Sequence, residues 1–341
     1  MDLFALTRAL VDIESTTPSE GRVSEFLYQH LAPMATRFGG KLERMPVESG
    51  RENIFVSFGA PIVTLSTHMD TVPPFFASSE DDTHIRGRGS CDAKGIIAAM
   101  IESARLLLES GTTNIGLLFL VGEERNSAGA LAAAKISRGA RYIINGEPTE
   151  NRLALGSKGS LRYQITARGR MAHSAYPELG ESAIEKLLDV LHDLRRMAMP
   201  SDPLLGASTL NIGTIEGGRA PNVIPDYARA EILIRLVDDP APLKQAVTKI
   251  CARRVEAEEV LCIPAVRLGS LDGYQTTVAA FTTDIPAFAG AWGTPFLIGP
   301  GTIHVAHTSK EHVAKKDLRD AVEIYMGMVK QLQSTSSGIS S

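Results

Sequence analysis

The stretch Ile115-Gly-Leu-Leu-Phe-Leu-Val-Gly-Glu-Glu124 places two adjacent carboxylates directly after an apolar run. A short apolar run of this kind is typical of a β-strand that is buried on both faces. Adjacent carboxylates at the end of such a strand repel each other and are costly to desolvate, so we expect a cation or a shared proton beside them. Neighbours on an extended chain point to opposite sides, which predicts that one carboxylate binds metal and the other handles protons. A solvated acidic turn is the alternative.

Three further apolar runs also end in side chains that bind metals or transfer protons. They are residues 62–65 before His68 and Asp70, residues 142–144 before Glu147, and residues 296–298 before Gly299-Pro-Gly301, His304 and His307. Parallel sheets place their ligands just beyond the carboxyl ends of their strands. The four runs therefore predict one edge at which His and carboxylate side chains converge, as in the two-metal site of a hydrolase.

His68 and Asp70 are two residues apart, so on an extended segment their side chains leave on the same side. Asp70 could then accept a hydrogen bond from one imidazole nitrogen of His68 while the other binds metal. Asp92 follows a Gly-rich segment and precedes a predicted helix. It could cap that helix, or it could bridge two cations through its two oxygens. Taken alone, His68-Met-Asp70 could be an ordinary hydrogen-bonded loop, and Glu147 before Pro148 a surface turn residue.

Composition limits the possible partners. The 341 residues are 44% hydrophobic and 22% charged, with a net charge of −4, which predicts two globular domains without a basic surface for nucleic acid or membrane. No apolar run reaches the roughly 18 residues of a membrane span or resembles a signal peptide, so we expect a cytoplasmic protein. Cys91, Cys251 and Cys262 fit reduced thiols. The nucleophile motif Gly-x-Ser-x-Gly and a complete dinucleotide-binding loop are absent from the sequence.

The order of the predicted elements indicates an α/β fold with a mainly parallel sheet and helices on both faces. Predicted helices cover residues 2–14, 19–38, 94–109 and 128–137 in the first part of the chain. From residue 158 the pattern changes to alternating strands at 161–167, 208–215, 227–237 and 260–266, with helices at 182–197 and 241–257. This predicts an inserted α+β domain with a four-stranded sheet and two helices. The expected division is 1–157 plus 269–333 for the catalytic domain, 158–268 for the insert, and a disordered tail at 334–341.

The sequence resembles the dinuclear zinc aminoacylase and carboxypeptidase family that includes acetylornithine deacetylase and succinyl-diaminopimelate desuccinylase. The matching segments occur in family order: Ser66-Thr-His-Met-Asp-Thr-Val-Pro73, Gly87-Arg-Gly-Ser-Cys-Asp-Ala-Lys-Gly95, Gly122-Glu-Glu124, Gly146-Glu-Pro-Thr149, Ala172-His-Ser-Ala-Tyr-Pro177, Gly217-Gly-Arg-Ala-Pro-Asn-Val-Ile-Pro225, and Gly299-Pro-Gly301 through Ala306-His-Thr308. Together they cover nearly the whole chain.

The resemblance implies a role for each residue of the predicted edge. One zinc ion would be held by His68, Asp92 and Glu147, and the other by Asp92, Glu124 and His307. Glu123 would be the general base, and Asp70 would orient His68. A metal-bridging hydroxide formed with the help of Glu123 would attack the amide carbonyl. Cobalt or manganese could replace zinc at such ligands.

The resemblance also implies that the insert is a lid and dimerisation domain, so we expect a homodimer. In relatives its histidine, here His173, reaches the partner's active site, while Asn222 and Arg235 match substrate-binding positions. The alternatives are a histidine that caps a turn, an asparagine that stabilises a loop and an exposed strand arginine.

The predicted function is removal of an acyl group from an N-acyl amino acid, in amino-acid biosynthesis. The sequence leaves the acyl group and the amino acid open. The alternatives are a dipeptidase or carboxypeptidase of the same family, acting on short peptides, and a catalytically silent protein that binds amino acid derivatives.

Overall fold

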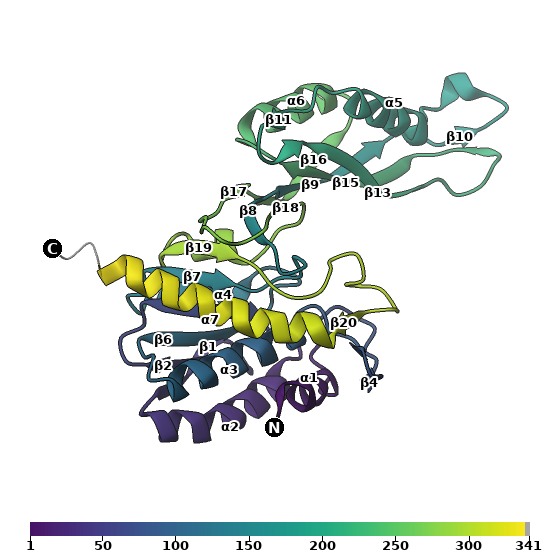
Figure 1. Ribbon diagram of the computed structural model, residues 1–341. Coiled ribbons are helices and arrows are strands. Elements are labelled where there is room, and N and C mark those ends of the chain that lie inside the picture. The colour runs from purple at the N-terminus through teal and green to yellow at the C-terminus, as the bar shows by residue number, and fades with distance from the viewer. Residues whose placement is uncertain (338–341) are drawn as a thin grey trace. The chain divides into compact units, whose positions relative to one another are not determined.

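The computed structural model describes residues 1–337, which form two compact units (Figure 1). Unit 1 is discontinuous in sequence and comprises residues 1–155, 268–277 and, from Thr283 onward, the rest of the described chain. Unit 2 comprises residues 156–267 and 278–282. From the sequence we placed the two breaks after residues 157 and 268. None of the described helices is both long and apolar enough to cross a membrane.

The centre of the unit 1 sheet is parallel, and this part carries the predicted strand ends. Strand order is β1-β2-β6-β3-β7-β19-β8, and β6, β3, β7 and β19 run parallel to one another. The bounds are β1 Lys41–Glu48, β2 Arg51–Phe58, β3 Val63–His68, β6 Ile115–Leu120, β7 Tyr142–Asn145, β8 Leu153–Ser157 and β19 Thr294–Leu297. Short strands β17 Val266–Arg267 and β18 Thr276–Ala279 pair with β8.

The sheet as a whole is mixed, because antiparallel strands flank its parallel centre. The β1–β2 hairpin turns at residues 49–50 and lies antiparallel to β6. Strand β8 lies antiparallel to β19 at the other side. The sequence analysis did not identify the hairpin, since charged residues interrupt the apolar pattern of β1. The expectation of a mainly parallel sheet therefore holds for the four central strands only.

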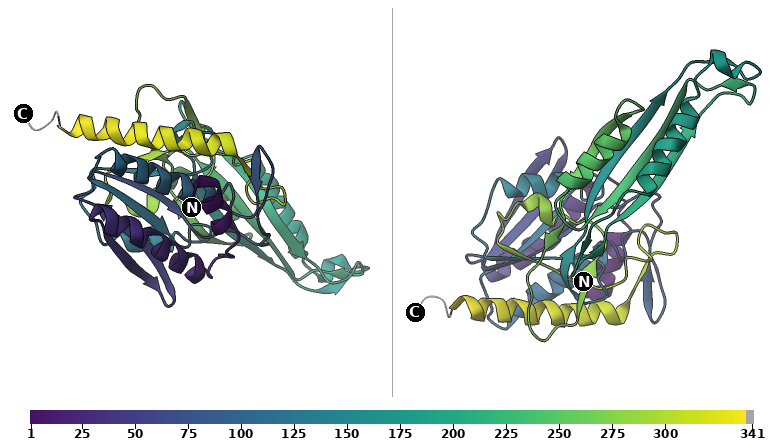
Figure 2. Two further views of the ribbon diagram at one scale, coloured as in Figure 1. Left: turned by 60° about the horizontal axis from the view of Figure 1, so that its bottom comes forward. Right: turned by 90° about the horizontal axis from the view of Figure 1, so that it is seen from above.

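Helices cover both faces of this sheet, as predicted (Figures 1 and 2). Because side chains alternate along a strand, Leu117 and Phe119 of β6 face one core while Leu118 and Leu120 face the other. The first core includes residues of the longer helices, and Trp292 lies in the second. These elements are α1 Leu3–Val11, α2 Gly21–Phe38, α3 Lys94–Glu109 and α7 Lys315–Ser337 on the first face, and α4 Ala128–Ala134 with the 3-10 helix η2 Ile285–Phe288 on the second.

A small three-stranded sheet completes unit 1. It consists of β4 Ser79–Glu80, β5 His84–Arg86 and β20 His312–Ala314, with β5 in the middle. Helix α7 follows β20 directly and runs through residues 334–337, where we had predicted disorder. That prediction is wrong for these four residues, because the Ser334 and Thr335 hydroxyls donate to the carbonyl of Gln331 and the helix continues. The remainder of the predicted tail, 338–341, lies outside the described residues.

Unit 2 contains the predicted four-stranded sheet, with two helices on one face (Figures 1 and 2). The strand order is β13-β15-β9-β16, and all neighbours are antiparallel. Helix α6 ends at Cys251 instead of residue 257, because Arg253 takes a left-handed φ of 60° and β16 then begins. The elements are β9 Gly159–Arg168, β10 Ala172–His173, η1 Pro177–Leu179, α5 Ala183–Arg195, β11 Ser201–Asp202, β12 Gly206–Ala207, β13 Thr209–Gly217, β14 Val223–Ile224, β15 Tyr227–Leu236, α6 Ala241–Cys251 and β16 Glu256–Ile263.

Candidate metal centre

The parallel strands of unit 1 bring the predicted ligands to one edge. His68 is the last residue of β3 and lies opposite Leu120, the last residue of β6. On the other side of β3, Ser66 lies opposite Asn145 at the end of β7. The segments that follow β6 and β7 carry Glu123, Glu124 and Glu147. The parallel strands therefore place Glu123, Glu124 and Glu147 near His68.

Four of the predicted ligands are in direct contact. His68 Nε2 lies 3.0 Å from Asp92 Oδ1. His307 Nε2 lies 3.2 Å from Asp92 Oδ2 and 3.1 Å from Glu124 Oε1. The ligand atoms of His68, Asp92 and Glu124 all lie within 4.8 Å of one another. Asp92 thus faces one histidine with each oxygen, as a carboxylate that bridges two cations would.

Asp92 does not cap helix α3, which was its alternative interpretation. The cap position belongs to Ala93, and no side chain caps the first turn. The Asp92 carboxylate contacts the two histidines instead, and the residue is 5% exposed.

Asp70 organises the residues around His68 and Glu123. His68 Nδ1 lies 3.0 Å from the Asp70 backbone oxygen and 3.5 Å from Asp70 Oδ1, so the carbonyl is the closer acceptor. The Asp70 carboxylate also accepts from the Thr17 hydroxyl at 2.6 Å and from the backbone N–H groups of Glu123 and Glu124 at 3.1 and 3.2 Å. The side chain is fully buried. Its carboxylate holds the acidic turn, and its expected role in orienting His68 stays a prediction.

Glu123 and Glu124 lie in a turn and not on an extended segment. Gly122 begins this turn with a φ of 80°, a left-handed value that favours glycine. We expected the two side chains to point to opposite sides because neighbours alternate along a strand. That reason is wrong, because the two residues lie in a turn. They nevertheless have different surroundings, since Glu124 contacts His307 while no hydrogen bond or ion pair to the carboxylate of Glu123 is formed by the described residues.

Burial of several carboxylates at one place shifts their pKa values. Desolvation raises the pKa of Glu123 well above its usual value, and the charge of Glu147 raises it further. Desolvation likewise raises the pKa of Glu147, which is 4% exposed and whose buried oxygen Oε1 has no hydrogen-bond partner among residues 1–337. A surface turn is thereby excluded for Glu147. An unpartnered carboxylate oxygen in a buried acidic cluster is a position that a cation would occupy favourably.

The two histidines balance part of this negative charge. Hydrogen bonds to Asp92 and Glu124 raise the pKa of His307 to about 10. Burial would lower the pKa of His68, but its hydrogen bonds to Asp70 and Asp92 raise it well above the usual value. Imidazole nitrogens and carboxylate oxygens are also the donors that zinc uses in hydrolases. The residues therefore fit a cation site.

His307 takes a left-handed φ of 62°. This backbone conformation costs a residue with a Cβ roughly 1–2 kcal/mol, and histidine visits it more often than most. Its ring contacts Asp92 and Glu124, whereas the His304 ring forms no hydrogen bond or ion pair in the described part of the chain. The geometry thus favours His307 over His304 as a ligand.

The predicted catalytic residue His173 and the predicted substrate-binding residues Asn222 and Arg235 lie in unit 2. Strands β10 and β14 pair His173 with Val223, and the Ser174 N–H donates to the Asn222 carbonyl at 3.0 Å, so His173 and Asn222 are neighbours. Arg235 lies near the end of β15, on the face opposite the core residues Ile232 and Ile234. Its guanidinium has no hydrogen bond or ion pair among residues 1–337, and partial burial lowers its pKa.

Comparison with known proteins identifies the family. Residues 155–259 match the model of the peptidase dimerisation domain. The whole chain is 37% identical over 340 residues to an M20 peptidase domain-containing protein of Schizosaccharomyces pombe, covering 96% of this chain and 84% of the relative. The chain belongs to the M20 peptidase family. It is therefore a hydrolase of the M20 metallopeptidase family.

Two other proteins are similar to this chain. A probable carboxypeptidase of Aspergillus terreus is 33% identical over 367 residues, which cover 94% of this chain and 84% of that protein. An M20 family metallo-carboxypeptidase of Sulfolobus solfataricus superposes with a TM-score of 0.77 at 17% identity, covering 97% and 99% of the two chains. At that identity the structural match shows a shared fold.

Arg88, Glu311 and Asp284 are among the buried charged residues of this M20 peptidase that its sequence did not single out. Glu311 and Arg88 form an ion pair behind Asp92, and each is 1% exposed. Asp284 is also 1% exposed, and burial raises its pKa to about 7, with the charges of Glu124 and Asp70 among the smaller causes. No local pattern distinguishes these residues from surface charges.

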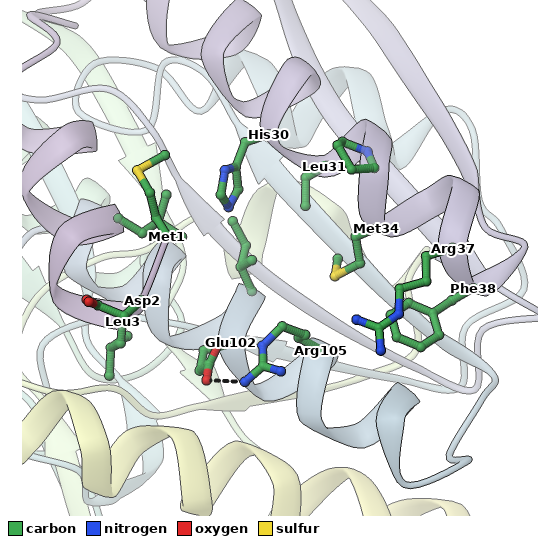
Figure 3. A pocket seen from close by; sticks show the side chains of 13 residues that line it. Met1, Asp2, Leu3, His30, Leu31, Met34, Arg37, Phe38, Glu102 and Arg105 are labelled. Atoms are coloured by element: carbon green, nitrogen blue, oxygen red, sulfur yellow. Dashed lines mark hydrogen bonds and ion pairs between the residues drawn. The ribbon is translucent and has the colours of Figure 1, made fainter.

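A hollow of about 220 Å³ lies elsewhere on unit 1 of the M20 peptidase (Figure 3). It is lined by residues of α1, α2 and α3, among them Leu31, Met34 and Phe38. Its Arg105 is paired with Glu102. None of the predicted ligands lines this hollow, so it is separate from the metal centre.

Proposed function

We propose that this M20 peptidase is a metal-dependent carboxypeptidase that removes the C-terminal residue from short peptides. The observation that carries the proposal is the contact of the buried Asp92 carboxylate with both His68 and His307, beside the carboxylates of Glu123 and Glu147. The family supports the reaction class, and the names of the fungal and archaeal relatives support the carboxypeptidase activity.

We further propose that the site holds two divalent cations, with zinc as the first candidate and cobalt or manganese as alternatives. His68 and Glu147 would hold one cation, Glu124 and His307 would hold the other, and Asp92 would bridge them. Such cations supply a polarised substrate carbonyl and a water molecule whose pKa is near neutrality. The unpartnered Oε1 of Glu147 supports this assignment.

Glu123 would act as the general base in this reaction. It accepts a proton from the attacking water and then returns that proton to the nitrogen of the leaving residue. Its carboxylate is free of hydrogen bonds from the described side chains, so it is available to the reacting groups. Asp70 fixes the backbone of Glu123 and thereby the reach of its side chain.

Binding of the substrate is proposed to involve residues of unit 2. The Arg235 guanidinium has no hydrogen bond or ion pair within the described residues, which suits a free α-carboxylate because the two groups can form paired hydrogen bonds. His173 would donate to the carbonyl oxygen as negative charge develops there. Asn222 would hydrogen-bond the substrate backbone. We also propose that unit 2 forms a homodimer, which the match of residues 155–259 to a dimerisation domain supports.

Hydrolysis of N-acyl amino acids is the second candidate. The segments Gly146-Glu-Pro-Thr149 and Gly299-Pro-Gly301 favour it through their resemblance to deacylases of arginine and lysine biosynthesis. Both candidate reactions cleave an amide bond next to a residue with a free carboxylate, so the same metal site and the same arginine would serve either of them.

The test is a comparison of substrates with zinc-loaded protein. We would measure amine release from dipeptides and tripeptides, from the same peptides with an amidated C-terminus, and from N-acetylornithine and N-succinyl-diaminopimelate. Cleavage of the free peptides but not the amidated ones supports a carboxypeptidase. Preference for an acyl amino acid would replace it with a deacylase, and two bound metals without any turnover would indicate a silent binding protein.

A further inference from the structure

The segment that carries Asp92 is built around the carboxylate of one residue, Glu311. Glu311 Oε1 accepts hydrogen bonds from the backbone N–H groups of Gly89, Cys91 and Asp92, at 2.9, 3.3 and 3.2 Å. Three amides that converge on one oxygen form an anion-binding concavity of the kind that elsewhere binds phosphate. In this protein an internal carboxylate fills it.

The second oxygen of Glu311 is paired with a buried cation. Glu311 Oε2 accepts from Arg88 Nη1, and Arg88 Nε donates to the Pro74 carbonyl at 3.2 Å. The Arg88 guanidinium also lies 5.1 Å from the centre of the Phe76 ring. A buried carboxylate needs such a partner, because an unpaired one would be strongly unfavourable. Both oxygens of Glu311 are thus committed to residues of the Asp92 segment.

Glu311 also lies in the same segment as a metal ligand. His307 precedes it by four residues, and the two belong to the connection between β19 and β20. On the front side His307 Nε2 contacts Asp92 Oδ2, and on the rear side Glu311 contacts the Asp92 backbone. The segment that carries Asp92 and the segment that carries His307 and Glu311 are therefore joined by two contacts. The contact of Glu311 with the Asp92 backbone limits the distance across which Asp92 and His307 could share a cation.

We propose that Glu311 is a positioning residue that sets the placement of Asp92 relative to His307 and so controls the metal affinity of the site. This inference rests on the proposed metal site and extends it to a residue that would not touch metal or substrate. Residues that orient metal ligands typically change metal affinity or activity by about 10–100-fold when substituted.

The variant Glu311→Gln tests the proposal, since it keeps the size of the side chain and removes its charge. We expect metal binding about 10–100-fold weaker by chelator competition. We also expect an altered visible absorption spectrum of the cobalt-substituted protein, because cobalt absorption reports the geometry of the ligands. Turnover at saturating metal should fall mainly in kcat.

Glu311→Asp is the second variant, in case the first fails to fold. It retains the charge but shortens the side chain, so it cannot reach Arg88 and all three amides together. We expect Glu311→Asp to weaken metal binding and alter the cobalt spectrum in the same direction as Glu311→Gln, but by smaller amounts. Leu107→Ala is the matched control, because Leu107 is fully buried in α3 and belongs to the hydrophobic core. It should lower stability while leaving the cobalt spectrum and metal affinity unchanged.

Wild-type metal affinity and spectrum in either folded Glu311 variant would overturn the proposal, as would changes no larger than those of Leu107→Ala. The proposed function fails in a distinguishable way, namely when the wild-type protein binds metal and hydrolyses none of the substrates. A wild-type protein that binds no divalent metal would overturn both.

Discussion

Asp70 Oδ1 accepts a hydrogen bond from the backbone N–H of Glu123 at 3.1 Å, so the residue whose carbonyl lies 3.0 Å from His68 Nδ1 also fixes the proposed general base. The other oxygen of Asp70 accepts from the N–H of Glu124 and from the Thr17 hydroxyl. One buried carboxylate therefore links a ligand on β3 to two acidic residues that follow β6.

Asp70→Asn should lower turnover by more than the loss of the Asp70–His68 interaction alone would cause. An amide group places N–H donors where Asp70 now accepts from Glu123, Glu124 or Thr17, so the acidic turn must shift. We expect kcat to fall about 10–100-fold, with metal affinity reduced over a similar range. The matched control is Thr17→Val, which removes one hydrogen bond to Asp70 and should cost about 1 kcal/mol of stability with little effect on kcat. Equal kcat losses in both variants would contradict this account.

Glu123→Gln should retain metal but lose most turnover, because glutamine cannot accept and return a proton. General bases contribute about 10²–10⁴-fold, so we expect a loss of that size in kcat. Metal content by plasma mass spectrometry and turnover on the preferred substrate would be measured on the same samples. Normal turnover would remove Glu123 from the role of base.

Asp92→Ala should reduce the metal content of both positions, since its two oxygens face His68 and His307 separately. Glu147→Gln should affect mainly one position, because only the cation proposed beside His68 would use that side chain. The measurement is the number of metal ions per chain after dialysis against a weak chelator. Retention of two ions in Asp92→Ala would exclude a bridging role.

Metal binding should release protons and become tighter as pH rises. In the metal-free protein the pKa of His307 is about 10, so at neutral pH its ring is protonated and must lose a proton to bind a cation. For each proton that the metal displaces, the apparent metal affinity should increase about tenfold per unit rise in pH, as long as the pH is below that pKa. Calorimetry in buffers of different ionisation enthalpy would count the protons, and a count that is unchanged in His307→Ala would contradict the assignment.

The same raised pKa has an opposite consequence for stability without metal. The pKa in the folded state lies above the unfolded value of roughly 6.5, so protonation of His307 stabilises the fold. The contribution is fully present below the unfolded pKa and is lost as pH rises through about 10. Metal-free protein should therefore lose stability over that range in thermal unfolding.

Asn53 should matter for stability through its two buried hydrogen bonds. Its Oδ1 accepts from the Val121 N–H at 3.1 Å and its Nδ2 donates to the Gly129 carbonyl at 2.9 Å, which ties β2 to the segment around the acidic turn. Asn53→Leu removes the acceptor of the buried Val121 N–H, at about 1–3 kcal/mol, whereas the Gly129 carbonyl keeps its bond within helix α4. Urea unfolding would measure the loss, and a change under about 0.5 kcal/mol would argue against these bonds.

The sequence alone was sufficient to predict the edge at which the ligands meet. Strands β3, β6, β7 and β19 are buried and end where the polar residues begin, so periodicity and composition located them. Helix α3 was predicted with its observed bounds, because its apolar positions recur at helical spacing up to Glu109.

The missed features depend on contacts that are remote in sequence. Glu311 bonds to residues 219–223 positions away, and nothing near it in the chain distinguishes a buried carboxylate from an exposed one. The β1–β2 hairpin was missed because its outer strand is largely polar. The separate surroundings of Glu123 and Glu124 arise from a turn after Gly122, which strand periodicity does not describe.

The position of β19 has a consequence for synthesis of the protein on the ribosome. This strand lies between β7 and β8, although the whole of unit 2 separates it from them in the chain. In the nascent chain the edge of β7 therefore stays unpaired until residues 294–297 emerge from the ribosome. His307 and Glu311 emerge later still. Binding of the cation proposed between Glu124 and His307 would then come only at the last stage of translation. Stalled chains that end before residue 294 should be protease-sensitive in unit 1 and should lack the cation proposed beside His307, whereas released full-length chains should be resistant.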